Sequence, residues 1–479
     1  MAEQSLKDKT VKGVLWSSVE RFSVQGVGFI VTLFTARVLS PSDYGLIGML
    51  AIFMAVAQTL IDSGFTQALI RKQDRTEVDN STVFYFNIIV SLFLYFLLFL
   101  IAPLVADFYD EPQLSTLMRV LCIVLVVNGL AVVQRAIYTT LIDFKTQAKA
   151  SFYAAVISGV VGVWMAYNGY GVWTLVWQQL LNAGINTLLL WFFSGWRPMW
   201  VFSWMSFREL FAFGSKLLAS ALLDTIYTNM YTLVIGKVFN AASLGNYAQA
   251  DRFAKLPSSN LTGILQRVTY PVLCTLQNDD NKLREEYRRL LRLSAYVIFP
   301  LMTLLAAISH PLIELLIGEK WHYAATLLIP VCFTLMWWPI HAINLNLLQV
   351  KGRSDLFLRL EVIKKIIGVM ILVISIPFGL LVMCYSGIAT SILCLIINTF
   401  YTGKIIRVGF LLQMKDIANT LFISLCMFAF VEFLFLFFSD IVWQLIIGCV
   451  AGLFFYVFAT FFLCPQEFKY IKKVINERS

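Results

Sequence analysis

Charged side chains lie inside long apolar stretches of this sequence. Arg21 stands about ten residues, or ~15 Å, into an apolar stretch that begins near Val11, with Glu20 beside it. That distance is close to the middle of a hydrocarbon core of about 30 Å. A charge at this depth is costly, and it usually faces the interior of a helix bundle or a water-filled cavity. Side chains of this kind can hold an ionic substrate.

Three further stretches carry the same pattern. Gln58, Asp62 and Thr66 recur every fourth residue on one helical face, and Lys216 and Asp224 follow one face of a later stretch. The stretch 244–276 contains four charged candidates, Asp251, Arg252, Lys255 and Arg267. The ten candidate substrate-binding residues, all polar or charged within apolar stretches, are Glu20, Arg21, Gln25, Asp62, Lys216, Asp224, Asp251, Arg252, Lys255 and Arg267. Their cations outnumber their anions, which favours an anionic ligand.

Two interpretations of these charges stay open. In the first, the charged stripes face one another across a hydrated cavity, and this is the interpretation that stripes in several stretches favour. In the second, Glu20 with Arg21 and Asp251 with Lys255 neutralise each other and only set helix packing.

Other polar residues of the apolar stretches have simpler explanations. Arg119 and Arg135 lie nearer helix ends, where a long cationic side chain extends to the membrane surface. His310 and His341 either couple proton flow or are packed polar groups. Glu432 has no evident role. The eight cysteines lie in or beside apolar stretches without CxxC spacing, so we interpret them as core or lipid-facing small residues. We expect no catalytic residue and no metal site.

The composition requires a membrane protein. Hydrophobic residues make up 59% of the 479, charged residues 14%, and mean hydropathy is +0.77; soluble domains carry about 25% charged residues. We count about fourteen apolar stretches that are long enough to span a bilayer: 11–36, 44–70, 82–106, 114–141, 149–167, 171–193, 209–236, 244–276, 291–317, 323–350, 356–378, 380–403, 415–438 and 440–464. Most lysines and arginines then fall in segments on one side, which the positive-inside rule places in the cytoplasm with both termini.

One short motif occurs twice. Residues 36–45 (ARVLSPSDYG) correspond to residues 236–245 (GKVFNAASLG), so that Arg37 aligns with Lys237 and Gly45 with Gly245. Each copy follows an apolar stretch that carries polar residues along one face, and each copy precedes the next apolar stretch. The two copies lie 200 positions apart, and a repeat with so long a period indicates that a large unit of the chain is duplicated. Six spans precede the second copy, so both copies enter the membrane from the same side.

These observations predict an all-α polytopic membrane protein with two pseudo-symmetric six-helix lobes and two additional C-terminal helices. The expected domains are residues 1–200 for the N-lobe, 201–410 for the C-lobe, and 411–479 for the last two spans and a cytoplasmic tail. A connector rich in tryptophan, residues 194–208, joins the lobes along the cytoplasmic surface. The positive charge is scattered through short loops, which argues against a nucleic-acid partner.

The motifs resemble a known family. Residues 37–45 (RVLSPSDYG), 62–65 (DSGF), 270–271 (YP) and 318–321 (GEKW) resemble the polysaccharide transporter family, in particular the Wzx-type exporters of colanic-acid and lipopolysaccharide repeat units. The resemblance covers about residues 7–407. It implies the fold of the multidrug/oligosaccharidyl-lipid/polysaccharide flippases, with an undecaprenyl-pyrophosphate-linked oligosaccharide as cargo. It also implies that the cavity cations, here Arg21, Lys216, Arg252, Lys255 and Arg267, hold the pyrophosphate.

The expected function is therefore a flippase, not an enzyme, in the inner membrane of a bacterium. It would act in surface polysaccharide biosynthesis with membrane lipids and other assembly proteins as partners. No cofactor is expected, although an H⁺ or Na⁺ gradient could drive transport. Two alternatives stay open: a cation-coupled multidrug exporter of related fold, which would prefer an acidic cavity, and a polysaccharide polymerase or ligase, which would need a large outer loop that the sequence lacks.

Overall fold

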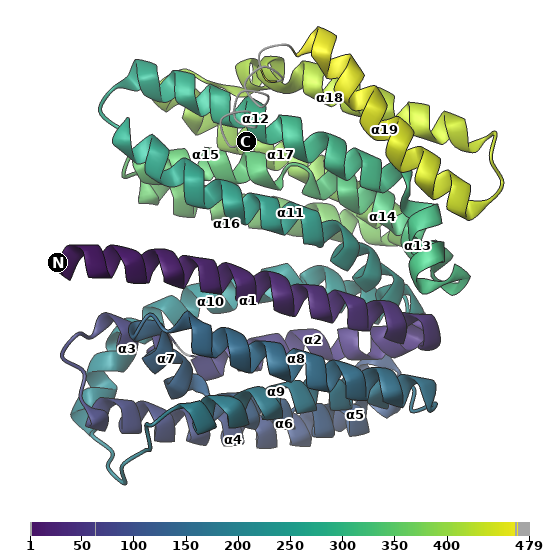
Figure 1. Ribbon diagram of the computed structural model, residues 1–479. Helices are drawn as coiled ribbons and strands as arrows, with labels where there is room; N and C mark the ends of the chain where they lie inside the picture. Colours follow the sequence, from purple (N-terminus) through teal and green to yellow (C-terminus); the bar gives the residue numbers. More distant parts are fainter. Residues whose placement is uncertain (1, 63, 465–466, 468–479) are drawn as a thin grey trace. The chain divides into compact units, whose positions relative to one another are not determined.

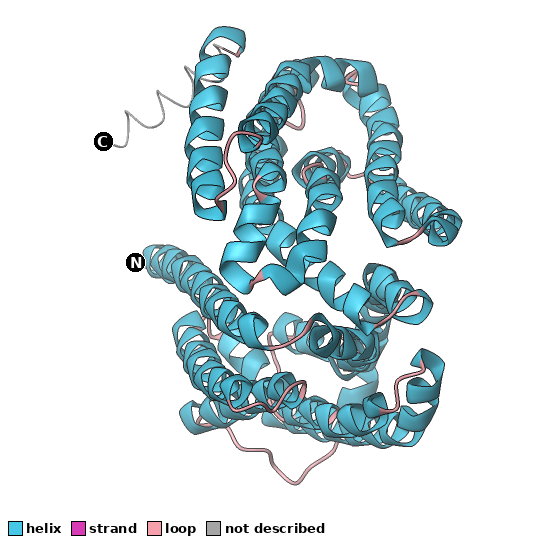
Figure 2. Ribbon diagram, turned by 90° about the vertical axis from the view of Figure 1, so that its right-hand side faces the viewer, coloured by secondary structure: helices cyan, strands magenta, loops and turns pink. Residues whose placement is uncertain are grey.

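The computed structural model describes residues 2–62, 64–464 and 467. Figure 2 shows that this part of the chain consists of helices joined by short loops, without a strand. An all-α protein is thus confirmed. The chain divides into two compact units, residues 1–245 (unit 1) and residues 246–479 (unit 2). The predicted division into residues 1–200, 201–410 and 411–479 stays a prediction, and the tail after residue 464 lies outside the described residues apart from Glu467.

Unit 1 contains the first ten helices, which Figure 1 shows in purple to teal. They are α1 (Ala2–Val38), α2 (Pro41–Asp62), α3 (Phe65–Arg71), α4 (Glu77–Tyr109), α5 (Gln113–Leu121), α6 (Ile123–Gly129), α7 (Val132–Thr140), α8 (Phe144–Tyr167), α9 (Trp173–Phe193) and α10 (Trp204–Val238). The predicted span 114–141 is broken into α5, α6 and α7. Helix α8 packs between α1 and α9, and α10 packs on α2, α3 and α4.

Unit 2 contains most of α11 (Ala241–Thr275) and the helices after it. They are α12 (Asp280–Ala307), α13 (Ser309–Ile317), the short 3₁₀ turn η1 (Glu319–Trp321), α14 (His322–Leu335), α15 (Trp338–Val350), α16 (Ser354–Ser375), the 3₁₀ turn η2 (Ile376–Phe378), α17 (Leu380–Ile406), α18 (Phe410–Phe435) and α19 (Ile441–Leu463). Helix α12 packs on α14, α15 and α18, and α17 packs on α14, α15 and α16.

Ten helical segments of the described chain are long and apolar enough to cross a membrane. A polytopic membrane protein is thus confirmed, whereas a count of fourteen is not. The other four predicted spans correspond to α1, α9, α11 and α16, which are helices of similar length that contain more polar or charged residues among the apolar ones. Helices α1 and α11 carry predicted polar stripes, so the charges that mark the candidate site are also what lowers their hydropathy.

Both copies of the repeated motif begin a helix with a side-chain cap. Before α2, the Ser40 hydroxyl accepts a hydrogen bond from the Asp43 backbone N–H at 3.3 Å, and the Asp43 carboxylate accepts one from the Ser40 N–H at 2.8 Å. Before α11, the Asn240 side-chain oxygen accepts from the Ser243 N–H at 2.7 Å. Each cap satisfies backbone donors that the first helical turn leaves without partners. The motif therefore fixes where the second helix of each hairpin starts.

Small residues let α8 approach its neighbours closely. Ala154, Ala155, Ser158 and Gly159 form a buried stripe along α8. A Cβ atom on Gly159 would lie 2.4 Å from a methyl group of Val31 in α1. Because lipid supplies little hydrophobic force between helices, such close backbone packing is the main source of their association.

One end of unit 1 is closed by an aromatic cluster. Phe65, Phe84 and Trp196 are buried there, and the Trp196 indole donates a hydrogen bond to Glu77. The connector predicted at residues 194–208 thus places one tryptophan in the core, whereas Trp200 is 94% exposed. An aromatic residue so exposed is typical of a membrane surface.

A lysine cross-links three helices near the same cluster. Lys72, directly after α3, places its Nζ 2.9 Å from the Glu209 carboxylate on α10 and 3.3 Å from the Asp79 carboxylate on α4. The hydrogen bond to Glu209 raises the pKa of Lys72 above its usual value. Asp79 also caps α4 through Thr76, so Lys72 neutralises a carboxylate that is almost fully buried.

Within unit 2, a charged pair attaches α18 to α12. Arg288 on α12 donates two hydrogen bonds to Asp416 on α18, at 2.7 and 2.6 Å. Arg292, one turn further along α12, lies 3.6 Å from the same carboxylate and 3.1 Å from Glu467. Asp416 is only 5% exposed, so the pair is a fixed attachment of α18 to α12.

Candidate functional site

Polar side chains from five helices gather in unit 1. Glu20 on α1 accepts a hydrogen bond from the Ser151 hydroxyl on α8 at 2.9 Å. Asp62 at the end of α2 accepts one from Gln58 at 3.3 Å, and Gln58 accepts one from Asn128 on α6 at 3.0 Å. The partners of Glu20 and Asp62 therefore come from other helices as well as from their own.

Arg135 on α7 is a third charged group of this region. It is partly buried and interacts electrostatically with both Asp62 and Glu20, without an ion pair within 4.0 Å to either among the described residues. We name Glu20, Asp62 and Arg135 the unit 1 charge cluster. Ionisable residues within membrane helices are rare and usually mark a functional site.

The break in the predicted span 114–141 positions this cluster. Helix α6 ends at Gly129, and α7 begins at Val132 after a short turn, so Asn128 and Arg135 point from two separate helices. Sequence reasoning assigned Arg135 to the membrane surface because it lies near the end of an apolar stretch. In the structure Arg135 is instead partly buried and interacts electrostatically with Asp62 and Glu20. That interaction is not evident from spacing along one helix.

Arg21 and Lys216 are the exposed cations of unit 1 among the predicted residues. Both lie on the surface of long helices, α1 and α10 respectively, and neither forms an ion pair with another described residue. Asp224 is also exposed, and Gln25 is partly buried with interactions of its own. Arg21 thus does not neutralise its neighbour Glu20, which is held by Ser151 instead.

In unit 2 the predicted residues lie along α11. Lys255 and Asp251 form an ion pair of 2.6 Å across one helical turn, and Lys255 is 46% exposed. Arg252 and Arg267 are exposed on the same helix. The Asp251–Lys255 geometry is the one that the packing interpretation expects, and it also leaves the Lys255 ammonium accessible.

The predicted cations lie at different depths. We refer to the helix ends at residues 37–45 and 237–245 as the motif ends. At about 1.5 Å per residue, Arg21 lies ~25 Å from the motif end of α1, and Lys216 ~33 Å from that of α10. Along α11, Lys255 lies ~21 Å and Arg267 ~39 Å from the motif end. The cations therefore extend from the middle of each helix to the end opposite the motif.

Other polar residues of unit 2 have local partners. The His341 ring contacts the Ser391 hydroxyl and the Asn398 amide, each at 3.1 Å, and is the packed polar group that one interpretation described. Lys364 pairs with Glu361 one turn away. Neither residue extends the candidate site.

Comparison with known proteins identifies the family. Residues 34–326 match the polysaccharide biosynthesis protein family, which is more than half of the chain. The chain belongs to this family. The resemblance inferred from the sequence motifs is thereby confirmed.

Two curated members of the wider group are similar to this polysaccharide biosynthesis protein over most of its length. The lipopolysaccharide biosynthesis protein WzxC of Escherichia coli is 26% identical over 78% of this chain and 76% of its own. The succinoglycan biosynthesis transport protein ExoT of Rhizobium meliloti is 24% identical over 66% of this chain and 64% of its own. Among solved structures, the lipid II flippase MurJ in an inward closed conformation has a TM-score of 0.73 at 15% identity, with 93% of this chain and 98% of MurJ covered.

The similarity to MurJ shows the fold of this family member. The ten candidate site residues stay predictions, because no comparison assigns a role to any of them. In unit 1, Arg135 interacts electrostatically with Glu20 and Asp62, and in unit 2, Asp251 forms an ion pair with Lys255. That residues of both units bind one ligand is likewise a prediction.

Proposed function

We propose that this protein is a flippase that moves an undecaprenyl-pyrophosphate-linked oligosaccharide repeat unit from the cytoplasmic to the periplasmic leaflet. It would act by alternating access in the inner membrane of a bacterium, with both termini in the cytoplasm. The family membership, the transport role in the name of ExoT and the fold shared with a lipid II flippase support this proposal.

One observation carries the proposal further than family membership does. Arg21 and Lys216 are exposed cations on membrane helices, and neither pairs with another described side chain. An unpaired cation in contact with acyl chains is unfavourable by several kcal/mol, so both groups are expected to face water or an anion. A pyrophosphate offers several anionic oxygens, and charge-assisted hydrogen bonds from arginine and lysine are among the strongest available to proteins.

The test is a leaflet-exchange assay on the full chain in proteoliposomes with a defined fluorescent lipid-linked oligosaccharide. Arg21→Ala and Lys216→Ala should insert and fold like wild type, yet lower the initial rate roughly tenfold or more, which is the loss expected for one charge-assisted hydrogen bond. Lys282→Ala is the matched control, because Lys282 is an exposed cation that forms an ion pair with Asp279.

The assay also separates the remaining alternatives. Wild-type rates in both cation variants would overturn the role of these charges. Export of cationic drugs without exchange of the glycolipid would indicate a multidrug exporter instead. Imposing H⁺ or Na⁺ gradients across the same vesicles identifies the driving ion, because only the coupled gradient changes the rate.

A further inference from the structure

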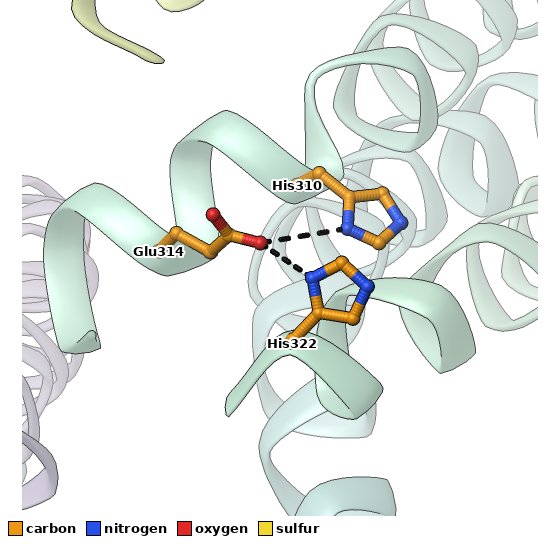
Figure 3. A group of neighbouring side chains, drawn as sticks. All are labelled: His310, Glu314 and His322. Atoms are coloured by element: carbon orange, nitrogen blue, oxygen red, sulfur yellow. Dashed lines mark hydrogen bonds and ion pairs between the residues drawn. The ribbon is translucent and has the colours of Figure 1, made fainter. Parts of the chain in front are cut away.

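Two histidines and a glutamate converge at the turn between α13 and α14 in unit 2 (Figure 3). His310 and Glu314 lie one turn apart on α13, and His322 is the first residue of α14. The Nδ1 atom of His322 lies 2.6 Å from Glu314 Oε1, and the Nδ1 atom of His310 lies 3.8 Å from the same oxygen. The three ligand atoms all lie within 4.8 Å of one another.

We propose that His310, Glu314 and His322 form a binding site for a zinc ion. Two imidazoles and one carboxylate are ligands that zinc accepts readily, whereas calcium and magnesium prefer oxygen atoms alone. Ligands about 2.0–2.1 Å from a tetrahedral zinc ion lie roughly 3.4 Å apart. The observed separations of 2.6 and 3.8 Å fall on either side of this value, so small side-chain rotations are sufficient.

The backbone holds the third ligand in place. The turn between α13 and α14 passes through Gly318, whose φ of 102° is accessible mainly to glycine. Trp321, the residue before His322, is fully buried and anchors the turn in the core. His322 therefore faces Glu314 because the fold directs it there, and binding does not require a loop to become ordered.

His310 supplies the observation that a simple hydrogen-bonded pair does not explain. Glu314 and His322 satisfy each other directly, but the Nδ1 atom of His310 is buried and has no hydrogen-bond partner in the described structure. The His310 and His322 rings nevertheless lie only 4.6 Å apart between centroids. Two imidazoles this close repel each other when protonated, and a metal ion would satisfy both in their neutral form.

The site is accessible and leaves one coordination position open. The side chains of His310 and His322 are 36% and 64% exposed, whereas Glu314 is 15% exposed. Zinc with three protein ligands usually keeps a water molecule or an anionic oxygen in its fourth position. Bound zinc would also join α13 to the start of α14, so it should raise the resistance of unit 2 to unfolding.

The test uses the purified full chain, freed of any histidine tag and stripped of metal with a chelator. Zinc binding is measured by titration calorimetry and by the visible absorption of cobalt as a tetrahedral probe. Wild type should bind one ion. His310→Gln, Glu314→Gln and His322→Gln should each weaken binding by more than about tenfold, since removing even an outer-shell partner of a zinc ligand costs that much. Thermal unfolding with and without zinc provides a second measurement.

Glu319→Gln is the matched control, because Glu319 lies in the same turn but outside the cluster. It should bind zinc like wild type. His310→Gln decides between the two explanations, since a structural Glu314–His322 hydrogen bond does not need His310. Binding by His310→Gln as tight as in wild type would overturn the proposal. So would the absence of a cobalt spectrum and a zinc-dependent melting shift in wild type.

Discussion

Gly45 and Gly245 pack against each other in a reciprocal backbone contact. A Cβ atom on Gly45 would lie 1.7 Å from the carbonyl oxygen of Ala241, and a Cβ atom on Gly245 would lie 1.8 Å from that of Pro41. Pro41 and Ala241 are equivalent positions of the repeat. The glycine of each copy of the motif thus packs against the first residue of the helix that begins in the other copy, as in a self-complementary two-fold interface.

We expect Gly45→Ala to destabilise the protein, because a methyl group has no room beside the Ala241 carbonyl and the helix starts must separate. Overpacking of this kind costs about 1–3 kcal/mol, and more where backbone atoms are in the way. Thermal unfolding in detergent measures the effect. Gly26→Ala is the control, since its added Cβ would meet nothing within 4 Å. Equal melting temperatures for both variants would contradict the close contact.

The unit 1 charge cluster predicts energetic coupling between Arg135 and Asp62. Arg135→Gln leaves two carboxylates without their cation, whereas the double variant with Asp62→Asn removes one of them. A double-mutant cycle on unfolding should give a coupling energy of about 0.5–3 kcal/mol. Lys282→Ala combined with Asp62→Asn is a control pair in which additivity is expected, because Lys282 is an exposed cation whose ion pair is with Asp279. A coupling near zero for Arg135 and Asp62 would show that they do not interact.

Exchanging the charges of Asp251 and Lys255 separates packing from ligand binding. The double variant Asp251→Lys with Lys255→Asp keeps the ion pair on α11 but moves the ammonium by one helical turn, or about 6 Å. We expect an unchanged melting temperature and a flipping rate roughly tenfold lower, if one charge-assisted contact to the substrate is lost. Transport at the wild-type rate would instead support the packing interpretation.

The attachment of α18 to α12 predicts a large effect at Asp416. Asp416→Ala leaves Arg288 and Arg292 without their shared carboxylate, and we expect a loss of about 1–3 kcal/mol of stability. Lys282→Ala breaks the exposed pair with Asp279 and should cost well under about 1 kcal/mol. Limited proteolysis and thermal unfolding compare the two. Similar losses in both variants would mean that the Arg288–Asp416 pair is not an anchor.

Much of this fold could be predicted because membrane helices follow hydropathy and loop charge. In the described chain the predicted spans consist mainly of helix, and the repeat at residues 36–45 and 236–245 correctly indicated equivalent helix starts, now seen as the caps at Ser40 and Asn240. The breaks after Leu121 and Gly129 were not predictable. Hydropathy averages over a span, whereas a break depends on tertiary contacts that stabilise a turn inside it.

The candidate site was predictable in composition but not in pairing. Charge within apolar stretches predicts Glu20 and Asp62 as site residues, but it does not predict that Arg135 interacts with both, because the three residues lie on helices far apart in sequence. The cluster of His310, Glu314 and His322 was missed for a similar reason. His322 lies near His310 and Glu314 because the chain turns at Gly318. A helical period relates residues within one helix and does not relate residues on either side of such a turn.

The Arg288–Asp416 pair also has a consequence for biosynthesis. The two residues are 128 positions apart, and a ribosome adds about 5–20 residues per second, so Arg288 emerges roughly 6–25 s before its carboxylate. Throughout that interval the growing polypeptide presents two guanidinium groups, from Arg288 and Arg292, that the finished molecule neutralises. The attachment of α18 to α12 therefore forms only after Asp416 has been synthesised, late in the production of the chain.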